Sequence, residues 1–96
     1  MTKVIVIGGE KGGTGKTTIS VNLAIMRALM GHDMLFIDAD KQRSGAKFFD
    51  RRNGNGVKPE ITCVNMLGKH LNSELDRLST KYESIIVDVG GRDSVE

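Results

Sequence analysis

A glycine-rich segment near the N-terminus, set between an apolar run and a helix-forming stretch, constrains the fold of this chain more than any other feature. The apolar run covers residues 4–7, and the segment comprises Gly8, Gly9, Glu10, Lys11, Gly12, Gly13, Thr14, Gly15, Lys16, Thr17 and Thr18. Glycines let the backbone N–H groups of such a turn point inward, and the following helix adds unpaired N–H groups and a positive dipole end. The segment therefore predicts a phosphate-binding loop between a strand and a helix.

The Gly-Lys-Thr end of this segment supplies the side chains that a nucleoside triphosphate needs. Lys16 is placed to reach the β- and γ-phosphates, and the Thr17 hydroxyl is placed to bind Mg²⁺. A second lysine, Lys11, stands before Lys16, and Glu10 occupies a position where the usual pattern G-x-x-x-x-G-K-[ST] has glycine. A carboxylate about 4 Å from phosphate costs about 1–4 kcal/mol, so we expect the Glu10 side chain to turn outward.

Four apolar runs predict the strands. They cover residues 4–7, 34–37, 61–64 and 85–89, and helix-length segments separate them. This spacing predicts an α/β fold with a parallel sheet flanked by helices. Three of the runs lack alternation, so we expect helices on both faces of those strands, whereas the run at 61–64 follows Pro59 and is expected at an edge.

Three helices are expected between these strands. The first covers about residues 16–30 and stops at Gly31, and it is apolar nearly all round, which predicts burial on more than one side. The second covers residues 44–52 and ends before a loop, 53–56, of alternating asparagine and glycine. The third is amphipathic, with an apolar stripe of Leu71, Leu75, Leu78 and Tyr82.

Composition describes one ordinary globular domain, residues 1–96. Apolar residues make up 39% and charged residues 27% of the chain, and no apolar run approaches the ~20 residues of a membrane span. The N-terminus enters the strand pattern without a signal sequence, so we expect a cytoplasmic location. The single cysteine, Cys63, excludes an internal disulfide and is expected to be a small buried strand residue.

The net charge of +2 is unevenly distributed along the chain. Residues 41–58 carry a net charge of +5, and the remainder carries −3. Such a basic segment is typical of a solvated helix face, of a surface for an acidic partner, or of a nucleic-acid contact. The sequence does not decide among these three.

Carboxylates follow two of the predicted strands. Asp38 and Asp40 come at the end of the second strand, and Asp88 lies in the fourth. Open α/β sheets bind ligands at the carboxyl ends of their strands, and a carboxylate there can hold the Mg²⁺ of a bound nucleotide. Each aspartate alone is equally typical of a turn or helix cap, but together with the phosphate loop they predict one site.

The chain resembles the ParA/MinD group of deviant Walker-motif ATPases. The resemblance rests on residues 11–18, on Asp38-Ala39-Asp40 and on Ile85-Ile86-Val87-Asp88, in the same order and spacing. It implies that Lys11 reaches the nucleotide of a second copy in an ATP-sandwiched dimer. It also implies that Gly12, Gly13, Thr14, Gly15, Lys16, Thr17 and Thr18 hold ATP, that Thr17, Asp38 and Asp88 hold Mg²⁺, and that Asp40 orients the attacking water.

Within this group, Gln42 and Ser44 make the chain most similar to small DNA-partition ATPases, although Lys41 stands where they usually have proline. The resemblance implies hydrolysis of ATP to ADP and phosphate, partners that include nonspecific DNA and a partition adaptor protein, and no membrane contact. The sequence leaves two related functions as alternatives, a MinD-like membrane switch and a tyrosine kinase of the polysaccharide type. A third alternative is a non-catalytic module that only dimerises or binds a partner.

Length departs from the group, because partition ATPases are about twice as long. The 96 residues resemble the N-terminal half of such a protein. The resemblance implies a P-loop NTPase-type sheet truncated to about four strands in the order 3-2-4-1, with the strand of residues 4–7 at an open edge. An apolar open edge pairs readily with another chain, so we expect association or strand exchange with a second copy.

Overall fold

Strands and helices alternate along the chain. The computed structural model describes the backbone of residues 3–8, 14–40 and 42–89, and the side chains of all of these except residues 14–17. The elements are β1 (Lys3–Ile7), α1 (Thr14–Leu29), β2 (Met34–Ala39), α2 (Ser44–Gly54), β3 (Thr62–Asn65), α3 (Gly68–Leu78) and β4 (Ser84–Val89). All strand pairs are parallel, which confirms the predicted α/β fold.

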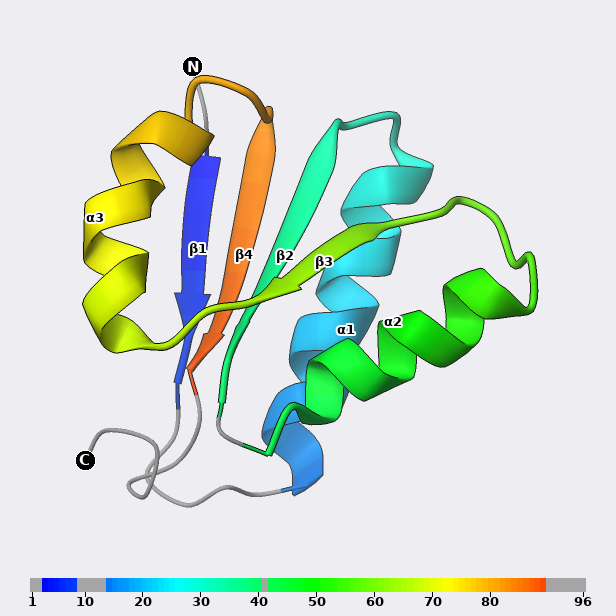
Figure 1. Ribbon diagram of the computed structural model, residues 1–96. Helices are drawn as coiled ribbons and strands as arrows, with labels where there is room; N and C mark the ends of the chain where they lie inside the picture. The colour runs from blue at the N-terminus through cyan, green and yellow to red at the C-terminus, as the bar shows by residue number, and fades with distance from the viewer. Residues whose placement is uncertain (1–2, 9–13, 41, 90–96) are drawn as a thin grey trace.

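The described strands form one sheet in the order β1-β4-β2-β3, as the resemblance implied. The strand arrows all point to the same end of the sheet, and the first turn of α1 lies near that end (Figure 1). β2 and β4 occupy the centre and are buried over nearly their whole lengths, as expected for strands with helices on both faces. β3 lies at an edge, as its position after Pro59 predicted.

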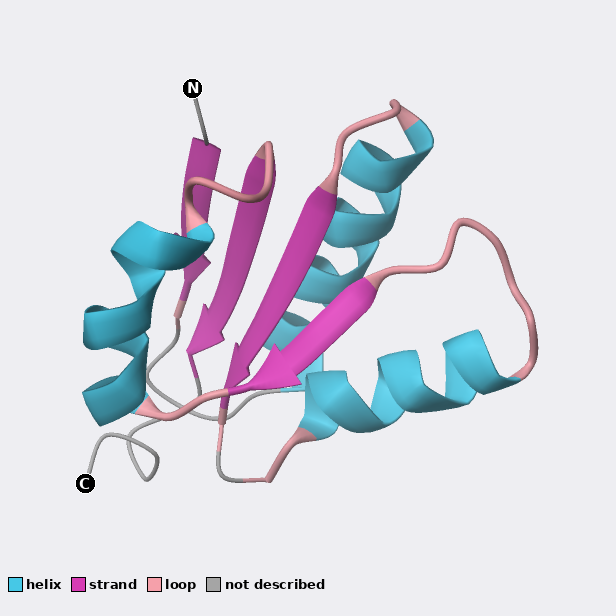
Figure 2. Cartoon of the chain, turned by 45° about the horizontal axis from the view of Figure 1, so that its top comes forward, coloured by secondary structure: helices cyan, strands magenta, loops and turns pink. Residues whose placement is uncertain are grey.

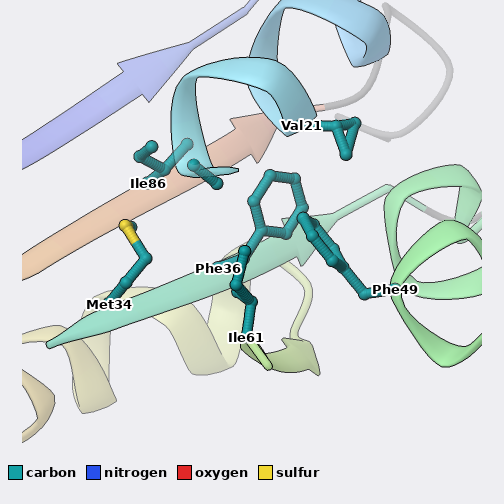
Figure 3. Close-up of a cluster of buried hydrophobic side chains, with 7 residues drawn as sticks. Val21, Met34, Phe36, Phe49, Ile61 and Ile86 are labelled. Carbon is teal, nitrogen blue, oxygen red and sulfur yellow. The ribbon is translucent and has the colours of Figure 1, made fainter. Parts of the chain in front are cut away.

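Two hydrophobic layers hold the helices against the sheet. On one face, Phe36 of β2 and Phe49 of α2 lie with ring centroids 4.9 Å apart, both fully buried, between Val21 of α1 and Ile61 (Figure 3). On the other face, leucines of α3 pack against the opposite side of β2 and β4. The result is a three-layer arrangement with α1 and α2 on one side of the sheet and α3 on the other (Figure 2).

The apolar outer face of α1 is exposed, which contradicts the expectation that this helix is buried on more than one side. Ile19, Met26 and Leu29 are 61%, 57% and 68% exposed. The sheet covers one side of the helix, where Val21 and Ala24 are buried, and nothing in the described part of the chain covers the opposite side. The predicted end of this helix is confirmed, because α1 ends just before Gly31, which has a φ of +93°.

β1 also departs from the expectation for strands of its type. Its side chains Val4 and Val6 are 38% and 61% exposed, although the run is as apolar as β2 and β4. β1 pairs only with β4 in the described sheet, and α3 packs on the central strands rather than over it. The strand is therefore an apolar edge, as the resemblance implied.

Two helix ends differ from the sequence-based expectation. α2 continues to Gly54, and the Asn53 side chain near its end exchanges hydrogen bonds with the Ile61 backbone, donating from Nδ2 at 2.9 Å and accepting at Oδ1 at 3.4 Å. α3 ends at Leu78, so Tyr82 lies beyond the helix, although it still packs against the same hydrophobic layer. No helix in the described ranges is both long and apolar enough to cross a bilayer.

Candidate nucleotide and metal site

Two aspartates meet at the carboxyl end of the sheet. Asp38 of β2 and Asp88 of β4 are partners in the register of these adjacent strands, and both are fully buried. α1 begins at Thr14 near the same end, as Figure 1 shows. The parallel topology therefore places both carboxylates beside the N-terminus of the helix that follows the glycine-rich segment, as expected for a ligand site in an open α/β sheet.

The carboxylate of Asp38 is bound by backbone on the α2 side. Its Oδ2 accepts a hydrogen bond from the Ala46 N–H at 2.8 Å, and its Oδ1 accepts one from the Asp40 N–H at 3.2 Å. Ala46 lies in the first turn of α2, whose N–H groups lack partners within the helix. Asp38 thus fastens the N-terminus of α2 to β2, a contact that the resemblance did not imply.

Burial raises the pKa of Asp38 above its usual 3.8, because removal from water penalises the charged form. The hydrogen bond from Ala46 opposes this rise, whereas the nearby carboxylates of Asp88 and Asp40 add to it by repulsion. A buried carboxylate beside two others is an environment that a divalent cation would relieve. A cation bound there would act against the rise in the pKa of Asp38, because it stabilises the charged form.

A glycine makes the close approach of α2 possible. A Cβ on Gly45 would lie 2.7 Å from Cε1 of the buried Phe36 ring and 3.5 Å from Oδ2 of Asp38. Only a residue without a side chain allows α2 to come near enough for Ala46 to reach Asp38. The turn that leads into the helix contains Arg43 in the left-handed region, with a φ of 57°.

Asp40 lies just past the end of β2, in a turn. Its Oδ1 accepts a hydrogen bond from the Gln42 N–H at 3.1 Å, and its backbone carbonyl accepts one from the Arg43 N–H at 3.1 Å. Asn65 at the end of β3 also contacts this turn, since its Nδ2 lies 2.7 Å from the Asp38 carbonyl oxygen and 3.2 Å from that of Asp40. Sequence reasoning missed Asn65, because an asparagine after a short edge strand carries no motif.

The residues predicted to hold phosphate are placed only in part. Lys11, Gly12 and Gly13 lie outside the described residues. Thr14, Gly15, Lys16 and Thr17 form the start of α1, but their side chains lie outside the description, and Thr18 is exposed in the same turn. The described structure thus brings Asp38, Asp40 and Asp88 to one end of the sheet and leaves the roles of the loop side chains as predictions.

The described donors suit Mg²⁺ only in combination with a nucleotide. Among the residues that the structure describes, no three acidic, histidine or cysteine side chains are close enough together to hold a metal ion. Mg²⁺ in nucleotide sites is typically bound by one or two carboxylates together with phosphate oxygens and water. Asp38 and Asp88 supply the carboxylate part of such a donor set.

Cys63 takes no part in this site. Burial, with a smaller contribution from the carboxylates of Asp38 and Asp50, raises the pKa of its thiol to about 12. The thiol is therefore protonated at neutral pH and packs among apolar side chains beside the Phe36 layer. Cys63 lies in a strand as predicted, but it is half-buried at the edge of the core rather than fully buried.

The basic segment forms the outer face of α2. Arg43, Lys47 and Arg51 are exposed and follow each other at four-residue intervals, opposite the buried face of Ala46 and Phe49. In the described part of the chain, none of these three side chains has an ion pair or hydrogen bond. This arrangement fits all three interpretations of the segment equally.

Comparison with known proteins assigns the chain to a family. The model of the CobQ/CobB/MinD/ParA nucleotide binding domain matches residues 5–93. The chromosome-partitioning ATPase Soj of Treponema pallidum is 38% identical over 77 residues, which are 78% of this chain and 28% of that protein. The arsenical pump-driving ATPase of Escherichia coli is 35% identical over 78 residues, 81% of this chain and 13% of that protein.

A solved structure supports the fold independently. A plasmid partition protein from Borrelia burgdorferi superposes with a TM-score of 0.62 at 21% identity, covering 93% of this chain and 56% of that one. This chain therefore spans only part of the length of the relatives that it matches. Together with the parallel sheet and its paired aspartates, the family match over residues 5–93 shows that the chain belongs to the CobQ/CobB/MinD/ParA family of nucleotide-binding domains.

Proposed function

We propose that this chain binds ATP with Mg²⁺ and hydrolyses it, and that the nucleotide switches the protein between monomer and dimer during partitioning of plasmid or chromosomal DNA. The pairing of buried Asp38 and Asp88 beside the start of α1 carries this proposal. The named function of the Treponema pallidum relative, chromosome partitioning, supports the choice of DNA as cargo. Nonspecific DNA and a partition adaptor are the partners we propose for the whole protein, and a cytoplasmic location suits both.

Each residue of the proposed site has one task. The backbone of residues 12–18 and the Lys16 side chain bind the phosphates, and Thr17, Asp38 and Asp88 hold Mg²⁺. The metal supplies charge neutralisation at the β- and γ-phosphates. Asp40 orients the attacking water, and Lys11 reaches the nucleotide bound to a second copy. Catalysis of this kind is positioning and charge stabilisation, so it depends on groups held in place before the reaction.

Titration with Mg-ATP tests the nucleotide site. We expect saturable binding by the wild-type chain, and loss of that binding in Lys16→Ala, because the variant lacks the cation that contacts the phosphates. Lys69→Ala, which removes an exposed lysine of α3, is the matched control and should bind as the wild type does. Equal binding by all three proteins, or binding by none, would contradict the proposal.

Hydrolysis by Lys11→Ala tests the dimer switch. If Lys11 acts on a second copy as an arginine finger does, its loss lowers the hydrolysis rate by about 10³-fold and leaves ATP binding intact. Steady-state phosphate release at saturating Mg-ATP measures this rate. A normal rate in Lys11→Ala would eliminate the sandwich-dimer part of the proposal while leaving the nucleotide site in place.

The exposed edge of β1 favours a second candidate function, a non-catalytic module that associates with another chain. Val6 is 61% exposed on a strand whose outer backbone groups have no neighbour among the described strands. Such an edge pairs with extended segments of other chains. Failure of all Mg-ATP binding together with concentration-dependent association would favour this module over the ATPase.

A further inference from the structure

The side chain of Asn65 contacts the backbone on both sides of Ala39, the residue at which β2 ends. It is the last residue of β3 and the register partner of Asp38. Its side-chain Nδ2 donates to the Asp38 carbonyl oxygen at 2.7 Å and to the Asp40 carbonyl oxygen at 3.2 Å. One amide therefore holds the backbone immediately before and immediately after Ala39, the final residue of β2.

The hydrogen-bond partners fix the orientation of this amide. Both partners are carbonyl oxygens, which can only accept hydrogen bonds, so the group that faces them must be the NH₂ of the amide. Its two protons satisfy both acceptors at once. A carboxylate of the same shape would instead place negative oxygen against two carbonyl oxygens.

The other hydrogen bonds of the Asp40 turn are local. The Gln42 N–H donates to the Asp40 carboxylate, and the Arg43 N–H donates to the Asp40 carbonyl. These bonds shape the turn, and the Asp40 N–H ties it to its own strand β2 by donating to Oδ1 of Asp38 at 3.2 Å. Among the described residues, the bond from Asn65 ties the turn to the neighbouring strand β3, which is paired with β2 from Thr62 to Asn65.

We propose that Asn65 is a positioning residue that holds the Asp40 turn against the end of the sheet and so sets the direction of the Asp40 carboxylate. This role rests on the proposed function, in which Asp40 orients the attacking water. Among the described residues, Asn65 donates hydrogen bonds only to backbone oxygens, so we assign it a role through Asp40 rather than on substrate. The carboxylate of Asp40 is well aimed for catalysis only while this turn is held.

Amide hydrogen exchange tests the contact without requiring activity. In Asn65→Asp we expect exchange of the Gln42 and Arg43 N–H groups to become about tenfold faster, because the turn has lost its bond to β3. Asn72→Asp, the same change at an exposed position of α3, should leave these two amides unchanged. Asn65→Ala removes the donor without adding charge and should give the same acceleration. Unchanged exchange in both Asn65 variants would overturn the proposal.

Hydrolysis kinetics separate positioning of Asp40 from a general structural effect. We expect Asn65→Ala to lower kcat about tenfold while KM for ATP stays within about twofold, because misaligned groups affect the reaction more than binding. In an Asp40→Asn background the same substitution should cause no further loss. A further loss in that background, or an increase in KM alone, would overturn the proposal. A wild-type chain that binds but does not hydrolyse ATP would contradict the proposed function, and hydrogen exchange would still decide the role of Asn65.

Discussion

At the scale of single residues, Asp38 has two opposing demands. It is a fully buried carboxylate near two others, and it is also the acceptor that fastens α2 to β2. Burial penalises the negative charge of Asp38. The hydrogen bonds from the N–H groups of Ala46 and Asp40, however, need an acceptor at each of its two oxygens. A bound cation would satisfy both, because it lowers the cost of the charge and leaves the hydrogen bonds in place.

The raised pKa of Asp38 makes stability depend on pH in a defined direction. Between 3.8, the usual value, and the higher folded-state pKa, the folded chain binds more protons than the unfolded chain, so the free energy of unfolding falls as the pH rises. Asp38→Asn removes this titration. The wild-type free energy of unfolding minus that of the variant should therefore be largest below pH 3.8 and decrease above it.

Urea denaturation of both proteins at a series of pH values measures this difference. Reversible two-state unfolding, with coincident transitions by two probes, is the condition for comparing them. A difference that rises with pH would show that the hydrogen bonds to Asp38 outweigh its burial. Such a result would reverse the assigned cause of the pKa shift.

At the scale of elements, the position of α2 depends on Gly45, a residue without a side chain. Gly45 lies in its first turn, where a Cβ would meet the Phe36 ring, and Phe36 is fully buried among its neighbours. The ring cannot move aside without disturbing the whole layer around it. The contact between α2 and the aspartates at the end of the sheet therefore depends on this glycine.

Replacing this glycine should reverse the usual effect of a glycine-to-alanine change in a helix. We expect Gly45→Ala to lower the free energy of unfolding by about 1–3 kcal/mol through overpacking. Gly54→Ala, in the same helix, has open space around the added Cβ and should be neutral or stabilising by up to about 1 kcal/mol. Chemical denaturation of the two variants beside the wild type measures both. Equal effects at the two positions would contradict the close approach.

Sequence patterns predicted which helices and strands form more accurately than they predicted where these elements end and what they contact. Runs of apolar residues identified each strand of the described sheet, because buried parallel strands leave a clear signal. They placed the end of α2 too early, at a point where the Asn53 side chain hydrogen-bonds to the Ile61 backbone, a contact that the composition of the loop does not reveal. The order of the strands came from resemblance rather than from spacing. Asn65 was missed for the same reason as Asn53, since its importance lies in partners distant in the sequence.

At the scale of the whole molecule, two apolar surfaces lack cover in the described structure. One is the edge strand β1, and the other is the outer face of α1 with Ile19, Met26 and Leu29. Contiguous exposed apolar surface is typical of a site of association. These surfaces explain why sequence reasoning expected more burial than the described residues provide, since the apolar pattern of α1 and β1 is that of elements covered on both sides.

Association through β1 should be sensitive to charge on that strand. We expect the mass of the wild-type chain in light scattering to rise with concentration, and Val6→Lys to remain monomeric, because a lysine on an edge strand opposes pairing. Val57→Lys makes the same change at a valine that is 44% exposed outside the sheet. It should associate as the wild type does. A monomeric wild type at every concentration would contradict this expectation.

The register of the sheet also determines the order in which the chain can fold. β1 pairs only with β4 in the described sheet, and this pairing joins Lys3 to Ser84. Within the described sheet, β1 can therefore pair only after β4 has been made, while β2 and β3 can pair as soon as both are made. Contacts between such distant segments slow folding, because the entropy of closing the intervening chain is lost first. The strand that leads into the glycine-rich segment thus gains its place in the described sheet only together with β4.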